Sequence, residues 1–323
     1  MPDRVPICLL VDDPCPLIHV YRDHWVDCHH KPAETDDGRP LMETIPNAFL
    51  DRFCDVMERW GIKGKFSIVP APAGKGDIVQ GIAGFDPALT REWLDTAQRR
   101  LGPLCDFCPE GITHNLAVNL ETGGFFPESE TDWSQYQTRE TLTPYLIRQL
   151  ELLKAAGIDA TGVTSPWVFG IKVEAEYIAA LVAAQKAVYD RDFSWYFLHM
   201  LWEKPATRPW IAYRQDGQTL VAIAATVADH WWDTINSPRT DADYIASITD
   251  RLLTADGQRG QIIAALEAGG WPVLLTHWQS LFSNGLETGL AVLEELARRI
   301  QTHLARRVEW KTCSEIARQT AAL

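Results

Sequence analysis

The chain has 323 residues, of which 46% are hydrophobic, and carries a formal net charge of -13. This size and composition allow one large α/β barrel or two ordinary domains, and they argue against a largely disordered chain. The acidic balance argues against nucleic-acid binding, which needs a basic face. No segment approaches the ~20 apolar residues that span a bilayer, and no signal pattern opens the chain. Seven scattered cysteines fit a reducing compartment, so we expect a cytoplasmic protein with no membrane partner.

The predicted elements alternate between strands and helices. A strand over residues 5–11 is followed by a polar segment over 14–46, which we interpret as an ordered, functional loop because of its length. The further elements expected in chain order are a helix at 47–60, a strand at 65–70, a helix at 87–100, a strand at 111–113, a helix at 138–156, a strand at 160–164, a helix at 173–186, a strand at 187–189, a hairpin of 210–214 and 219–225, helices at 241–253 and 259–268, a strand at 272–276, a helix at 286–305, a strand at 307–310 and a terminal helix. This alternation predicts an α/β fold with a largely parallel sheet, in one domain spanning 1–323.

Polar or aromatic clusters follow several of these predicted strands. In a barrel the ends of parallel strands meet at one face, so clusters far apart in sequence become neighbours. A purely structural alternative for Asp12-Asp13 is that an acid before proline only caps the following turn. The clusters are Asp12-Asp13, Thr113-His114-Asn115, Thr164-Ser165-Pro166-Trp167, Asp229-His230-Trp231-Trp232-Asp233 and Thr276-His277-Trp278.

These clusters occur in the order of a known set of motifs. Val11-Asp12-Asp13-Pro14 is similar to T-F-D-D-G-P, and Thr113-His114 to the start of H-[ST]-x-x-H. Further along, Thr164 to Trp167 stands in the place of R-x-P-[YW], Asp229 to Asp233 in that of an acid- and tryptophan-bearing motif, and Leu275-Thr276-His277 in that of L-x-H. Because these motifs occur in this order, the chain resembles the polysaccharide deacetylase superfamily, which comprises metal-dependent carbohydrate esterases and related amide hydrolases. The segment from Trp310 to Ile316 resembles the closing strand and helix of that family.

The resemblance implies a fold and a set of roles. The fold would be a distorted seven-stranded (β/α) barrel, largely parallel, here with a small β-hairpin insertion. Asp12 would act as the general base, Asp13 and His114 would bind a divalent metal, for which zinc is the first expectation, and His277 would protonate the leaving group. Such a metal would lower the pKa of a bound water and polarise the scissile carbonyl.

The chain departs from the family pattern at three positions. The second motif histidine would fall at Val118, which cannot bind a metal, so the third protein ligand is unknown. Asn119, Glu128 or a loop histidine could supply it. The family arginine would fall at Thr164, and the glycine after the acid pair is absent.

Aromatic residues near the strand ends predict a carbohydrate-sized ligand. Flat aromatic faces suit the C–H surfaces of sugars, and the indole adds a hydrogen-bond donor. We therefore expect Trp167, Trp231, Trp232 and Asp233 to bind substrate. His19, His24 and His29 recur every five residues, a spacing that neither a helix nor a strand aligns on one face.

The first hypothesis is thus a metal-dependent, deacetylase-like hydrolase that cleaves an N-acyl or amide bond of a saccharide or related small molecule. One alternative is a glycosidase on the same barrel, with two of Asp12, Asp13, Asp229 and Asp233 as acid and base. The other is a catalytically silent carbohydrate-binding descendant, which the valine at position 118 keeps open. The oligomeric state does not follow from the sequence.

Overall fold

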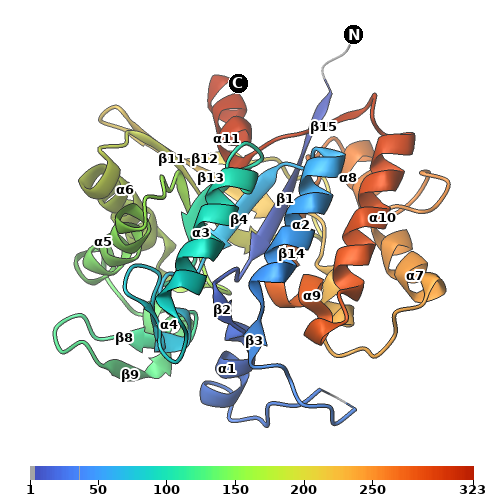
Figure 1. Ribbon diagram of the computed structural model, residues 1–323. Coiled ribbons are helices and arrows are strands. Elements are labelled where there is room, and N and C mark those ends of the chain that lie inside the picture. Colours follow the sequence, from blue (N-terminus) through green and yellow to red (C-terminus); the bar gives the residue numbers. More distant parts are fainter. Residues whose placement is uncertain (1–3, 36) are drawn as a thin grey trace.

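Two sheets of mainly parallel strands form the centre of the computed structural model, which describes residues 4–35 and 37–323 (Figure 1). The first sheet has the order β14 (Val273–His277), β1 (Val5–Asp12), β4 (Gly64–Ile68) and β7 (Cys105–Pro109), and β15 (Val308–Trp310) pairs with the beginning of β1. The second sheet has the order β10 (Gly162–Thr164), β11 (Phe193–Met200), β13 (Gln218–Ala225) and β12 (Trp210–Gln215).

Isolated bridges connect the edges of the two sheets. Glu110 pairs with Thr164 between β7 and β10, and Val227 pairs with Leu274 beyond the end of β13. Within the second sheet only β12 is antiparallel, and it joins β13 through the turn at 216–217. The predicted α/β fold with a largely parallel sheet is therefore confirmed, and so is the antiparallel hairpin.

Helices surround the strands, as expected for parallel strands connected by crossovers (Figure 1). Local signals set their ends: α2 stops at Gly61, whose φ of 60° allows the left-handed turn that terminates it. Outside the segment over 14–46, the helices of seven or more residues are α2 (Asn47–Trp60), α3 (Pro87–Leu101), α5 (Arg139–Ala155), α6 (Glu174–Tyr189), α7 (Ala242–Leu252), α8 (Gln261–Glu267), α10 (Thr288–His303) and α11 (Cys313–Ala322).

Two predicted strands are misplaced. The strand expected at 187–189 is the last turn of α6, which ends where Asp190 adopts a left-handed conformation, and the true strand is β11. The strand expected at 111–113 lies earlier, as β7, and Gly111 begins the turn that follows it with a φ of 64°. Local composition was misleading because β7 contains Asp106 and Pro109, both poor strand formers.

The long segment over 14–46 has its own secondary structure. Strands β2 (Leu17–Ile18) and β3 (Thr44–Ile45) pair with each other, and helix α1 (Val20–Asp27) lies between them in the chain. Several of its side chains are buried, among them Val20, His24 and Leu41. The segment is thus packed against the rest of the molecule.

Strand β1 is buried on both faces, which explains its continuous run of apolar residues. Ile7, Leu9 and Val11 pack in the main core cluster, whereas Cys8 and Leu10 point to a second cluster that includes residues of α11. This alternation follows from the two-residue period of a strand. Because β1 is central and buried on both faces, its C-terminal end is held firmly in place by the surrounding core.

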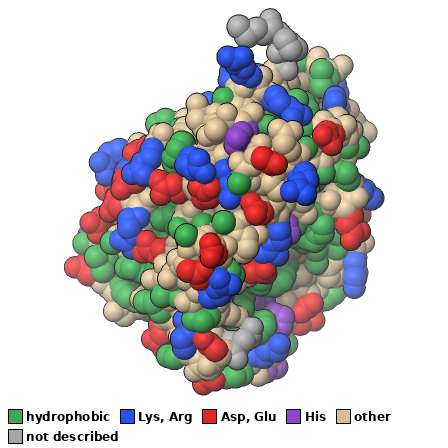
Figure 2. Space-filling model, turned by 90° about the vertical axis from the view of Figure 1, so that its right-hand side faces the viewer, with side chains coloured by type: hydrophobic (Ala, Val, Ile, Leu, Met, Phe, Trp, Pro, Cys, Tyr) green, Lys and Arg blue, Asp and Glu red, His purple; other side chains and the backbone are tan. Residues whose placement is uncertain are grey.

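Charge on the molecular surface is mixed. On the face shown in Figure 2, acidic and basic side chains are interspersed rather than separated into patches of one sign. On α10, for example, Arg298 and Arg299 both pair with Glu295. Among the described residues, no helix is long and apolar enough to cross a membrane.

The close approach of β4 to β1 gives a test of this packing. A Cβ added at Gly64 would lie 1.8 Å from the carbonyl oxygen of Leu9. We expect Gly64→Ala to lower the free energy of unfolding by about 3 kcal/mol or more, because neither backbone can move away. In the matched control Gly124→Ala, the added Cβ would lie 3.5 Å from Thr122 Oγ1. This change should lower the free energy of unfolding by less than about 0.5 kcal/mol. Urea denaturation measures both, and equal losses would contradict the packing described.

Candidate active site

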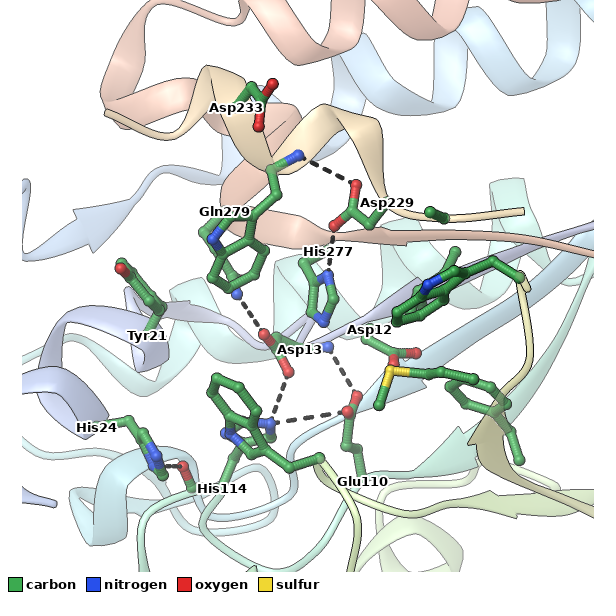
Figure 3. Close-up of a pocket in the computed structure, with 17 residues that line it drawn as sticks. Asp12, Asp13, Tyr21, His24, Glu110, His114, Asp229, Asp233, His277 and Gln279 are labelled. Carbon is green, nitrogen blue, oxygen red and sulfur yellow. Dashed lines mark hydrogen bonds and ion pairs between the residues drawn. The ribbon is translucent and has the colours of Figure 1, made fainter. Parts of the chain in front are cut away.

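A cavity of about 450 Å³ opens at the carboxyl ends of the strands (Figure 3). Parallel α/β folds commonly place their chemistry at this edge. Residues that are distant in sequence meet there, including most of those predicted as site residues. The predicted residues that line the cavity are Asp12, Asp13, His114, Trp167, Trp232, Asp233 and His277.

Asp13, Glu110 and His114 form a buried cluster at the floor of this cavity. Asp13 directly follows β1, Glu110 directly follows β7, and His114 lies in the next turn. The distance from His114 Nε2 is 2.8 Å to Asp13 Oδ1 and 3.7 Å to Glu110 Oε1. Candidate ligand atoms of the three side chains all lie within 4.8 Å of one another. Figure 3 shows the three groups facing a common point.

The electrostatics of the cluster call for a positive charge. Burial raises the pKa of Glu110 to about 8, and the charges of Asp12 and Asp13 add to this effect. Burial would lower the pKa of His114, but the Asp13 carboxylate raises it to about 10. Burial would raise the pKa of Asp13, yet His114 holds it well below its usual range. Either a proton on His114 or a cation can balance the carboxylates.

The free atoms of the cluster fit a metal ion. Each carboxylate has one oxygen already engaged: Glu110 Oε2 accepts the backbone N–H of Asp13 at 2.7 Å, and Asp13 Oδ2 accepts the amide of Gln279. Asp13 Oδ1 is buried, lies 2.8 Å from His114 Nε2, and makes no hydrogen bond of good geometry among the described residues. Two oxygens and the Nε2 atom of His114 therefore remain on one side as a mixed N/O ligand set, which suits a divalent metal.

Glu130 holds the turn that carries His114. Its carboxylate accepts the backbone N–H groups of Ile112, Thr113 and His114 at 2.7, 3.1 and 2.8 Å, and also the hydroxyl of Tyr145. These bonds support the positive φ of 52° at His114. The Nδ1 atom of His114 is buried without a described partner, so the side chain is positioned mainly through its backbone.

Glu110 is a residue that the sequence interpretation missed. Asn119 bonds to the backbone of its own turn and Glu128 accepts the Tyr136 hydroxyl, and neither lines the cavity. Glu110 and His114 have the four-residue spacing of the motif, with Glu110 in the first place and His114 in the second. The four-residue spacing thus leads from His114 back to Glu110, and not forward to Val118.

The loop histidines surround the cluster without joining it. His24 Nδ1 lies 3.0 Å from the carbonyl oxygen of His114, and its ring stacks on Trp167 with centroids 5.7 Å apart. His29 packs against the ring of His24. His19 is buried, and its Nδ1 atom lies 2.7 Å from the carbonyl oxygen of Met42.

Asp12 is paired with a second residue absent from the predicted site, Lys65. The Lys65 ammonium donates to Asp12 Oδ1 and, at 2.9 Å, to Ser67 Oγ. The Lys65 side chain is fully buried. Burial would lower its pKa, but the charge of Asp12 keeps that pKa above its ordinary value. A buried cation from β4 thus stands beside Asp12, whereas the family arginine would have fallen at Thr164.

His277 is paired with Asp229. Its Nδ1 atom lies 2.6 Å from Asp229 Oδ2, and Asp229 Oδ1 accepts the backbone N–H of Trp232 at 3.2 Å. Burial would lower the pKa of His277, but the hydrogen bond to Asp229 and the charge of Asp13 raise it to about 9. At neutral pH the imidazole is therefore protonated.

Aromatic side chains form the upper part of the cavity. Trp167 and Trp202 are 44% and 38% exposed, and Trp232 packs edge-on against the ring of His277. Trp231 differs from the prediction, because it is fully buried in the main core and does not line the cavity. Asp233 lies at the rim, where it accepts a bond from Arg251 at 2.5 Å.

Comparisons with known proteins support the fold. No family model matches the chain, and no curated protein matches it. A solved structure described as a putative polysaccharide deacetylase from Mycobacterium smegmatis aligns over 100% of this chain and 92% of that chain, with a TM-score of 0.56 and 15% identity. The chain shares the fold of that protein. The resemblance to polysaccharide deacetylases is thus confirmed at the level of the fold.

Two further structures are more distant. A mutant of a CE4 family pseudoenzyme aligns over 98% of this chain and 68% of that chain, with a TM-score of 0.42 and 11% identity. The exo-beta-1,4-mannosidase Op5Man5 from Opitutaceae bacterium strain TAV5 aligns over 93% and 60%, with a TM-score of 0.39 and 13% identity. Both similarities are too weak to bear on this site.

The buried pair of Lys65 and Asp12 can be tested by a double-mutant cycle. We expect Lys65→Met to lower the free energy of unfolding at pH 7 by about 3 kcal/mol, because Asp12 loses its buried counter-charge. Adding Asp12→Asn should restore part of this loss. Lys63→Met removes a half-exposed pair with Glu315 and should cost less than about 1 kcal/mol. Denaturant unfolding measures all variants, and additive losses in the cycle would show that the pair is not coupled.

Proposed function

We propose that the protein is a metal-dependent hydrolase that cleaves an N-acyl or other amide bond of a saccharide or related small molecule. The observation that carries this proposal is the convergence of Asp13 Oδ1, Glu110 Oε1 and His114 Nε2 on one side of the cavity floor. The deacetylase-like fold supports it as well. The cavity is of a size that accepts a small organic molecule.

The three residues of the cluster would hold the metal, and two further residues would move protons. A bound divalent metal would lower the pKa of a water and polarise the scissile carbonyl. Asp12 lines the same cavity and would accept the proton of the attacking water, while Lys65 keeps its carboxylate in place. His277 would donate a proton to the leaving nitrogen, because Asp229 orients its ring and favours the protonated form.

The pairing of the carboxylates favours this reaction over the glycosidase alternative. A glycosidase needs two carboxyl groups available as acid and base or nucleophile. Here Asp13 faces His114, Asp229 is bonded to His277 and Asp233 is paired with Arg251, so Asp12 would lack a second available carboxyl group among the four candidates. A silent carbohydrate-binding protein is separated from a hydrolase by the two experiments that follow.

The metal site gives the first experiment. We expect the purified protein to bind one divalent ion per chain, tested with zinc by calorimetry and by metal analysis. Glu110→Gln should weaken binding by more than ~10-fold, because the amide is a poorer ligand than the carboxylate. The control Glu128→Gln changes a carboxylate outside the cavity and should leave the affinity unchanged. Failure to bind any divalent ion, or equal affinities in the two variants, would refute the metal-dependent reaction.

The pairing of His277 with Asp229 predicts a pH effect. The leaving group needs protonated His277, so activity should fall as the pH rises through the pKa of His277, about 9. Asp229→Asn removes the charge that raises this pKa, and the alkaline limb of the kcat profile should therefore move about one pH unit or more toward acid. NMR titration of His277 measures the same pKa directly. Asp216→Asn in the exposed hairpin turn is the control, and an unchanged His277 pKa in Asp229→Asn would contradict the assigned role.

A further inference from the structure

The walls of the cavity differ in chemistry from its floor. Above the reacting groups the lining consists largely of apolar and aromatic side chains from several different elements. Phe197 and Met200 come from β11, Trp202 follows that strand, Trp167 follows β10, and Trp232 lies in the short helix after β13. Figure 3 shows aromatic rings on both sides of the labelled carboxylates and imidazoles. A ligand that reaches the floor must therefore pass along flat apolar surfaces.

Outside the candidate metal cluster, the charged groups of the cavity are already compensated. Asp12 is paired with Lys65, Asp229 with His277, and the rim residue Asp233 with Arg251. In the described chain, no lysine or arginine lines the cavity, and the protonated His277 is already bonded to Asp229, so an anionic group on a substrate would find no cationic side chain that lacks a carboxylate partner. A charged ligand would be desolvated without a partner, which is costly. This balance favours a neutral ligand.

The polar atoms of the walls are also few. A sugar unit carries several hydroxyl groups, and each one that is buried needs a hydrogen-bond partner. Most polar side chains of the cavity belong to the candidate metal cluster or to the pairs just described, and the carboxylate of Asp229 is further occupied by the N–H of Trp232. Outside this set the polar side chains are Tyr21, His24 and Gln279, of which Gln279 donates to Asp13 and His24 Nδ1 lies against a backbone carbonyl oxygen. The rest of the wall offers ring faces, indole N–H groups and a thioether. Burial of a polyhydroxylated ring would thus leave hydroxyl groups unpaired.

Trp167 adds an independent observation. Its backbone has a φ of 52°, a conformation that bulky residues rarely adopt, and its indole is 44% exposed at the cavity. The ring is held by stacking on His24. Backbone strain combined with an exposed apolar surface is unfavourable in the free protein. A flat apolar ligand that covers the indole would offset part of this cost.

From these observations we infer that the substrate is a neutral small molecule with a flat apolar or aromatic group next to its acyl-nitrogen bond, rather than a polyhydroxylated sugar unit. This inference rests on the proposed hydrolase function and narrows its substrate class. The apolar group would lie between the rings of Trp167, Trp202 and Trp232, and the acyl carbonyl would lie at the floor near Asp13 and His114. Shape and apolar contact would then select the substrate, with little contribution from charge.

Equilibrium binding tests the inference separately from catalysis. The dissociation constants of acetanilide, N-acetylglucosamine and 4-acetamidobenzoate are measured by calorimetry on the full chain, with and without a chelator. These three probes share an acetamide group and differ in apolar surface, hydroxyl content and charge. We expect acetanilide to bind at least ~10-fold tighter than each of the other two. A difference of this size is expected when the weaker ligand lacks one good apolar contact or buries one polar group without a partner.

Variants locate the binding. Trp202→Ala should weaken acetanilide binding by about 10-fold. It should leave N-acetylglucosamine nearly unchanged, because the sugar hydroxyl groups would lack the hydrogen-bond partners that they need to be buried against this wall. Trp167→Ala serves as a second variant in case the first disturbs the loop. Tyr136→Ala removes an aromatic ring that is 59% exposed and does not line the cavity, and it should leave all three constants unchanged.

Each outcome has a distinct meaning. N-acetylglucosamine binding as tightly as acetanilide, acetanilide failing to bind, or 4-acetamidobenzoate matching acetanilide would overturn the inferred substrate class. Loss of metal binding or of all hydrolysis would instead refute the proposed function and leave the binding preference intact. The two proposals can therefore fail independently.

Discussion

Two adjacent carboxylates, Asp12 and Asp13, end the central strand where water is nearly excluded, and they are only 4% and 2% exposed. An ionised carboxylate in such a place costs several kcal/mol unless a positive charge or good hydrogen bonds accompany it. The neighbouring elements supply these partners separately. Lys65 from β4 neutralises Asp12, whereas His114 and Gln279 surround Asp13. These separate partners would allow two like residues to take the different roles that we propose for them.

The hydrogen-bond ladders of the sheet fix this arrangement. In the register of β1 with β14, Asp12 lies opposite His277, and in the register of β1 with β4, Lys65 lies opposite Leu10. The proposed base, its ammonium partner and the proposed acid therefore belong to three adjacent strands. Groups on a rigid sheet keep their geometry better than groups on loops. In the candidate metal cluster, Asp13 and His114 lie outside the strands. The backbone N–H of Asp13 donates to Glu110, and Glu130 holds the turn of His114 by binding three successive backbone N–H groups.

Much of this site could be predicted from the rule that strand ends converge. Asp12, Asp13, His114 and His277 each follow or end a strand, and the cavity contains them all. Glu110 was missed because the strand before it was expected at 111–113, which left the glutamate on the wrong side of a strand boundary. Local patterns place such boundaries poorly where a strand contains Asp106 and Pro109.

The positions of Lys65 and Trp231 in the structure could not be predicted from the sequence, for a different reason. A lysine near the start of a predicted strand normally faces solvent, and only the pairing of β4 with β1 shows that this one is buried against a carboxylate. Trp231 and Trp232 are adjacent in sequence and chemically identical. Which of them enters the core depends on the turn of the short helix that contains both, and the structure buries Trp231 and leaves Trp232 at the cavity.

His24 connects the wall of the cavity to its floor. Its ring stacks on Trp167, and its Nδ1 atom lies within hydrogen-bond distance of the carbonyl oxygen of His114. Burial lowers the pKa of His24 to about 4, so the ring is neutral at pH 7, and the hydrogen bond to a carbonyl requires the proton on Nδ1. One imidazole therefore contacts both the indole of Trp167 and the turn that presents a metal-ligand candidate. The segment over 14–46 thus contributes more than a cover to the cavity, because His24 on its helix α1 joins the aromatic wall to the turn of His114.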